Sequence, residues 1–112
     1  MAAVFVGGEV PLTGTTPVTV VPAPAGGKQR EVLSLLGVNR DTAQRTLIAK
    51  KLKTAGSVSF EIGRAVIAAG LRAQLLLGTV VLDDTDETIT VETDATAATT
   101  EPIVDRAIFE VP

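Results

Sequence analysis

The sequence predicts an all-β protein, a single antiparallel β-sandwich or barrel-like domain of seven to nine short strands. The chain has 112 residues, which is the usual size of one domain with one core. Short runs of β-branched residues recur at a spacing of roughly ten residues, and turn residues separate them. Hydrophobic residues make up 46% of the chain, which indicates a packed core rather than disorder.

The first segment, residues 1–16, holds one short apolar run, Val4-Phe5-Val6, stopped by Gly7-Gly8. Two interpretations stay open. The run is either the first strand of the sandwich or an arm that adds as a strand to a neighbouring subunit. In both cases Val4, Phe5 and Val6 are the candidate partner-contact residues, and residues 17–112 form the sandwich domain.

Four runs in the first half of that domain are predicted strands: 17–21, 30–38, 44–52 and 57–62. Turn residues separate them at 22–27, 39–42 and 54–56. In the second run, Val32, Ser34, Leu36 and Val38 alternate with Leu33, Leu35 and Gly37, so we expect both faces to be buried at its middle. The fourth run alternates through Val58, Phe60 and Ile62, and we expect it to end at Gly63.

The stretch 64–77 has two interpretations. Its apolar spacing and alanine content suit one helical face, whereas Gly70 at its middle favours two strands broken at that residue. Further strands are predicted at 79–82, 88–93 and 103–111, with a loop at 94–100. Because Ile89 and Val91 alternate with polar neighbours, we expect the strand at 88–93 to be half exposed.

Several residue types are absent. The chain has no His, Cys, Tyr or Trp and only three Phe. Histidine most often carries acid–base catalysis near neutral pH, and aromatic rings stack on sugars and unpaired bases. We therefore expect no enzyme, no catalytic residue, no cofactor and no disulfide.

The acidic turn at 83–87 is the segment most like a metal site, since Asp84 and Asp86 could be two calcium ligands. It lacks the glycine and the distal glutamate of a calcium loop, so we interpret it as a solvated turn and expect no metal. The basic group Lys50, Lys51 and Lys53 suggests either nucleic acid or a sheet edge protected by lysines. We favour the edge, because no aromatic residues accompany the lysines and the net charge is −3.

The apolar segments 65–71 and 73–82 are separated by Arg72 and too short to span a membrane, so we expect no membrane partner. The N-terminus lacks the basic start and apolar core of a signal peptide. Charge is uneven: residues 28–72 hold nine of the ten Lys and Arg, whereas 73–112 hold nine acids. Contact between oppositely charged parts of different copies is therefore plausible.

Five segments resemble a pattern common in small virion proteins of tailed bacteriophages. They are VVPAPAGGKQREV at 20–32, VNRDTA at 38–43, AAGL at 68–71, VLDDTDETI at 81–89 and TTEP at 99–102. The resemblance covers residues 16–111 and includes the closing strand.

The resemblance implies a non-enzymatic β-sandwich module of the virion, assembled in the host bacterial cytoplasm. Its partners would be the major capsid protein or other virion proteins, and its expected state is a homo-oligomer, a trimer on three-fold positions of the head. The chain lacks the long variable extension of a fibre, which favours a capsid decoration or cement protein. The alternatives are a tail, baseplate or head-fibre attachment module and, in another class, a host-surface or carbohydrate-binding module.

Overall fold

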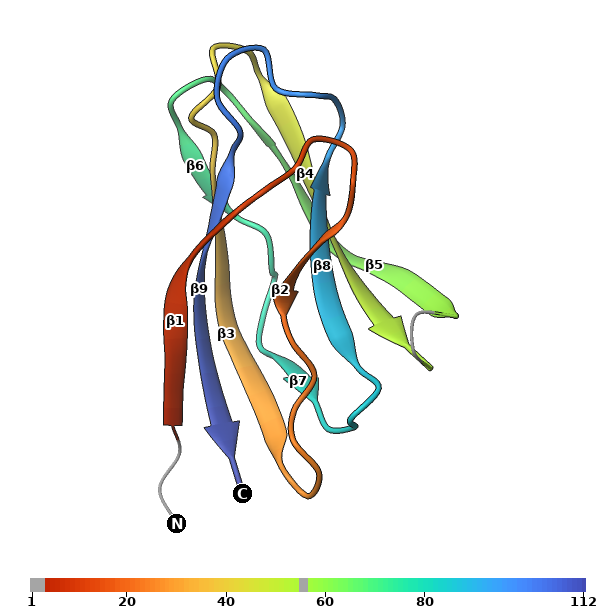
Figure 1. Cartoon of the computed structure of the whole chain (residues 1–112). Helices are drawn as coiled ribbons and strands as arrows, with labels where there is room; N and C mark the ends of the chain where they lie inside the picture. The colour runs from red at the N-terminus through yellow and green to blue at the C-terminus, as the bar shows by residue number, and fades with distance from the viewer. Residues whose placement is uncertain (1–3, 55–56) are drawn as a thin grey trace.

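The computed structural model describes residues 4–54 and 57–112, which form nine strands in two antiparallel sheets packed face to face (Figure 1). The predicted sandwich is confirmed, with nine strands in the part described. No helix that could span a membrane occurs in these residues. The strands are β1 (Val4–Pro11), β2 (Val18–Val21), β3 (Gln29–Val38), β4 (Arg45–Lys53), β5 (Val58–Ile67), β6 (Arg72–Gln74), β7 (Val80–Leu82), β8 (Thr88–Thr93) and β9 (Ile103–Val111).

The two sheets divide the strands by pairing rather than by sequence. In the first sheet the order is β1-β9-β3-β6, and β7 also pairs with β3. Strand β6 pairs with residues 36–38 of β3, and β7 pairs with residues 30–32. The two short strands therefore lie beside different parts of β3. The second sheet has the order β2-β8-β4-β5. Most pairings therefore join segments that are far apart in the sequence.

The core lies between the sheets, where every second residue of the inner strands points inward. Leu35 of β3 and Ile108 of β9 meet Leu47 of β4 and Ile89 of β8, and all four are fully buried. Gly37 also belongs to this inner face: a Cβ there would lie 2.8 Å from the Leu47 side chain. The second sheet therefore packs directly against the backbone of β3.

A β-bulge in β3 changes the predicted alternation. The register with β9 shifts between Val32 and Ser34, which leaves Leu33 as an extra residue. Val32, Leu35 and Gly37 consequently share the core side, whereas Leu33 is 44% exposed. The expectation that both faces of this strand are buried was wrong at Leu33, because strict period-two reasoning does not allow for a bulge.

Residues 64–77 form strands rather than a helix. Strand β5 continues through Gly63 to Ile67, and the chain turns at Gly70, whose φ is 77°, into β6. The interpretation with two strands broken at Gly70 is confirmed and the helical one was wrong. Neither Gly63 nor the Gly7-Gly8 pair ends its strand. Strand β5 stays paired with β4 beyond Gly63, and β1 stays paired with β9 beyond Gly8.

Strand β8 is more buried than expected. It lies between β2 and β4 in the second sheet, and Ile89, Thr90, Val91 and Thr93 are all buried. The half-exposed interpretation was wrong, because β8 is an inner strand and Lys50 of β4 lies beside Thr90 and Glu92 on its polar side. The predicted turn at 54–56 falls partly on residues 55–56, which lie outside the described residues, as do residues 1–3.

Candidate protein-contact surface

The outer face of the first sheet, turned away from the core, carries a group of apolar side chains. Phe5 of β1, Leu33 of β3 and Val81 of β7 are 59%, 44% and 40% exposed, and Phe109 of β9 is half-buried among them. We call these four residues the outer patch. Phe5 is opposite Phe109 in the register of the sheet, Phe109 is also opposite Glu31, and Glu31 is also opposite Val81. These side chains therefore form one row across the four strands β1, β9, β3 and β7.

Local packing holds the Phe5 ring in place at the edge of the sheet. The ring contacts Phe109 edge to face, with centroids 5.5 Å apart and an interplanar angle of 64°. It also lies over Gly7, where a Cβ would come within 2.7 Å of the ring. Because Gly7 has no side chain, the ring can lie along β1.

Three carboxylates share this outer face. Glu31 lies within the row of the outer patch, and Glu9 of β1 is the register partner of Asp105 of β9. Glu9 and Asp105 are both exposed, and like charges directly opposite in a sheet repel. Within residues 4–54 and 57–112, none of the three forms an ion pair. The face around the outer patch is therefore apolar with uncompensated negative charge.

The outer face of the second sheet differs in its charge pairing. There Lys50 forms an ion pair with Glu92 at 3.0 Å, and Arg64 forms one with Glu61. Positive and negative charges on this face thus neutralise each other. The carboxylates beside the outer patch are not neutralised in this way by any residue that the structure describes.

The three candidate contact residues lie together in β1 but do not share one face. Val4, Phe5 and Val6 pair with Glu110, Phe109 and Ile108 of β9. Residues 4–11 therefore form the first strand of the sandwich, which is one of the two alternatives left open by the sequence. Phe5 points outward and Val4 is 57% exposed, whereas Val6 packs against the core. Their role in partner contact stays a prediction.

The acidic turn contains one buried carboxylate. Glu87 is fully buried, 3.1 Å from Lys51 Nζ and 3.2 Å from Lys53 Nζ, and the Asp83 N–H donates to it at 2.9 Å. Burial alone would raise the pKa of Glu87, but these donors outweigh burial and lower the pKa to about 2. The solvated-turn interpretation was therefore wrong for Glu87. No group of three or more potential metal ligands occurs in the part of the chain described.

The basic group is not on a sheet edge. Strand β4 lies between β8 and β5, so the interpretation as a lysine-protected edge was wrong for that strand. Lys51 and Lys53 point toward Glu87, and Lys50 lies on the opposite face with Glu92. Lys51 also donates to the carbonyl oxygen of Val81 at 3.2 Å. Lys51 and Lys53 thus hold the second sheet against β7 and the acidic turn.

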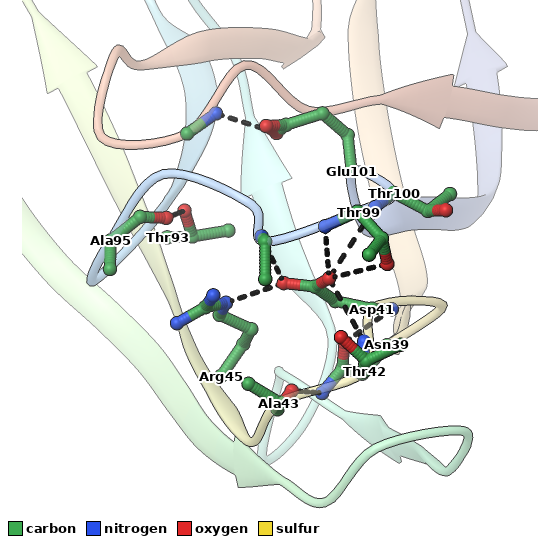
Figure 2. Close-up of polar contacts among 12 residues, drawn as sticks. Asn39, Asp41, Thr42, Ala43, Arg45, Thr93, Ala95, Thr99, Thr100 and Glu101 are labelled. Atoms are coloured by element: carbon green, nitrogen blue, oxygen red, sulfur yellow. Dashed lines mark hydrogen bonds and ion pairs between the residues drawn. The ribbon is translucent and has the colours of Figure 1, made fainter.

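The most connected polar residue, Asp41, was not singled out by sequence reasoning. Figure 2 shows its carboxylate accepting hydrogen bonds from the 94–102 loop and from Arg45. The N–H of Ala98, followed by those of Thr99 and Thr42 and by Arg45, holds the pKa of Asp41 well below its usual range despite burial. In the sequence Asp41 is recognisable as part of a turn motif, Asn39-Arg40-Asp41-Thr42. Such a motif does not predict hydrogen-bond donors 57 to 59 residues away.

The fold and surface together define a two-sheet β module with one apolar, acidic outer face. The sequence matches no protein-family model and no protein in a search of curated proteins.

Proposed function

We propose that this chain is a non-enzymatic virion structural protein, a capsid decoration or cement protein that binds the phage head and stabilises it. The outer patch is the observation that carries the proposal, together with the resemblance in residues 16–111. In this account the major capsid protein covers the outer face of the first sheet. The chain acts in the virion after assembly in the host bacterial cytoplasm.

The outer patch suits protein contact on energetic grounds. Full burial of a Phe, Leu or Val side chain contributes ~1.5–3 kcal/mol, and aromatic residues dominate the energy of many interfaces. A sheet face is also rigid, so little conformational entropy is lost when it docks. Four apolar side chains held on paired strands therefore form a preorganised contact.

The charge of this face favours a particular partner chemistry. Glu9, Glu31 and Asp105 lie beside or within the row of apolar residues. A partner with Lys or Arg around an apolar patch would relieve the Glu9–Asp105 repulsion, whereas an acidic partner would add to it. We expect the head surface that receives the chain to be apolar with a basic rim.

Self-association on the particle belongs to the same proposal. The resemblance implies a homo-oligomer on the head, where closed symmetry lets one surface serve every copy. The uneven charge of the sequence is compatible with contact between copies.

Binding to undecorated heads tests the proposal through two matched variants. Leu33→Glu places a charge in the outer patch, and Val66→Glu places the same charge at a comparably exposed site on β5 of the second sheet. We expect Leu33→Glu to weaken binding roughly tenfold or more, because a hot-spot side chain is lost. Val66→Glu should bind as the wild type does. Equal loss in both variants, or a wild-type chain that does not bind heads, contradicts the proposal.

A further inference from the structure

The strands at the sheet edges differ in how well they are protected against pairing with another chain. Strands β6 and β7 have three residues each, and Lys51 donates to the Val81 carbonyl of β7. Strand β2 has four residues and a register shift between Thr19 and Val21. Strand β5 is long, but its register also shifts, opposite Ala49 and Lys50, and it carries the Glu61–Arg64 ion pair. Short length, irregular register and charge all discourage strand addition.

Strand β1 has none of these protections over most of its length. It has eight residues and keeps an unbroken register with β9 from Val4 to Pro11. Glu9 is its one charged residue, and the strand carries no lysine or arginine. Gly8, with a φ of 110°, is a local irregularity inside that register. A long edge with an unbroken register and few charges is the kind of edge that pairs with another strand.

We propose that β1 pairs antiparallel with β1 of a second copy across a two-fold axis at Gly7. Gly7 then faces Gly7 of the second copy, and Val4 faces Val10. The two first sheets join into one continuous sheet with both outer patches on the same side. A two-fold contact of this kind closes at two chains.

The position of the Phe5 ring favours this register. Because each ring lies over its own Gly7, pairing Gly7 with Gly7 brings the two rings together at the axis. In this register the two Gly7 residues are directly opposed and roughly 5 Å apart. The two rings that lie over them are therefore within the range of aromatic contact. An axis at Val6 would instead place each Phe5 opposite the Gly7 of the second copy, and that Gly7 is already covered by the second copy's own Phe5 ring.

Charge and proline placement agree with the same register. The two Glu9 side chains lie on opposite sides of the axis, each facing a Phe5, so no like charges are opposed. Pro11 falls outside the paired residues 4–10. An axis at Gly8 would place Pro11 opposite Phe5, within the ladder, where proline has no N–H to donate.

Sedimentation equilibrium of the purified chain tests the proposal without reference to a phage particle. We expect a mass of two chains for the wild type. Phe5→Glu should weaken the dimer roughly a hundredfold or more, because it removes both central rings and places each introduced carboxylate opposite a Glu9. Adding Glu9→Lys to Phe5→Glu restores attraction at both places and should recover most of the dimer.

The matched control is Phe60→Glu, since Phe60 on β5 is 45% exposed and lies outside the proposed contact. It should leave the two-chain mass unchanged. A wild-type monomer or trimer, a dimer lost in Phe60→Glu but kept in Phe5→Glu, or no recovery in the double variant overturns the proposal. A dimer that fails to bind heads would support this contact and contradict the virion function.

Discussion

Two buried carboxylates hold the two ends of the sandwich. At one end Asp41 ties the turn after β3 to the loop before β9 through backbone N–H groups of Ala98 and Thr99, each at 2.9 Å (Figure 2). At the other end Glu87 joins the acidic turn to two lysines of β4. Both carboxylates are acceptors for several donors, which favours the charged form.

These carboxylates predict that acid destabilises the fold. The folded-state pKa of each is lower than its unfolded value, so each contributes stability that is complete at neutral pH. For Glu87 that contribution falls as the pH drops below about 4.5 toward about 2. For Asp41 it begins to fall below the ordinary value of 3.8 and continues to fall at lower pH. In Asp41→Asn the amide keeps one acceptor oxygen, but its NH2 group cannot accept and it has no charge to pair with Arg45, so the donors at one of the two carboxylate oxygens lose their acceptor. Thermal melting should therefore show a larger difference between wild type and Asp41→Asn at pH 7 than at pH 3.

The exposed Asp105→Asn variant is the control for this measurement. Asp105 faces Glu9, so its neutralisation removes a repulsion and should not lower the melting temperature at pH 7. A difference between Asp41→Asn and wild type that stays the same from pH 7 to pH 3 would show that the charge of Asp41 is not what stabilises the loop.

The sequence could not show that either carboxylate is buried and hydrogen-bonded. The hydrogen-bond donors of Asp41 are remote in the sequence, and the burial of Glu87 depends on packing against the other sheet. Asp41 was visible as a turn residue and Glu87 as part of an acidic run. The Ala98 and Thr99 donors come from the other end of the chain, and the lysines from β4. Phe5, by contrast, was a candidate contact residue, and the structure leaves it 59% exposed.

At the scale of elements, β5 shows how a glycine permits the close approach of another segment, the one that links β6 to β7 of the first sheet. The chain after β6 passes over Gly63, and a Cβ built on that residue would lie 1.8 Å from the Leu75 carbonyl oxygen. Leu75 N–H donates to Leu35 O on β3, so this linking segment is fixed to the first sheet on its other side. The segment therefore has no room to move away from a larger side chain at residue 63.

Replacing Gly63 with alanine should destabilise the fold by about 1–3 kcal/mol or more, because the backbone of Leu75 has to shift. Denaturant unfolding measures the change as a lower midpoint at an unchanged slope. Gly78→Ala is the matched control, since its Cβ would meet nothing within 4 Å. Equal stability of Gly63→Ala and Gly78→Ala would contradict the close approach at Gly63.

The strands were predictable where local alternation and turn residues are sufficient, as for β2, β4 and β9. The alternation of apolar and polar residues could not predict three features: the bulge at Leu33, the continuation of β5 past Gly63, and the inner position of β8 in its sheet. Each of these depends on which strands become neighbours, and the neighbours are distant in sequence. The same limit explains why the lysines of β4 were assigned to an edge although β4 is an inner strand.

At the scale of the whole molecule, the two outer faces of the sandwich are chemically different. The first sheet carries the outer patch with carboxylates that form no ion pair within the described residues. On the second sheet Lys50 of β4 is paired with Glu92 of β8, and Glu61 is paired with Arg64 within β5. Strand β1 forms an edge of the first sheet (Figure 1). Phe5 of this strand lies on the outer face and is 59% exposed. We therefore place the proposed partner contact on one side of the molecule.

A cryo-microscopy map of heads incubated with the purified chain tests this assignment most directly. The proposal predicts that density for the chain rests on the capsid protein through the outer face of β1, β9 and β3, with Leu33 and Val81 buried and basic capsid residues near Glu31. A chain bound through the second sheet, with the outer patch facing solvent, or heads that carry no density for the chain, would contradict it.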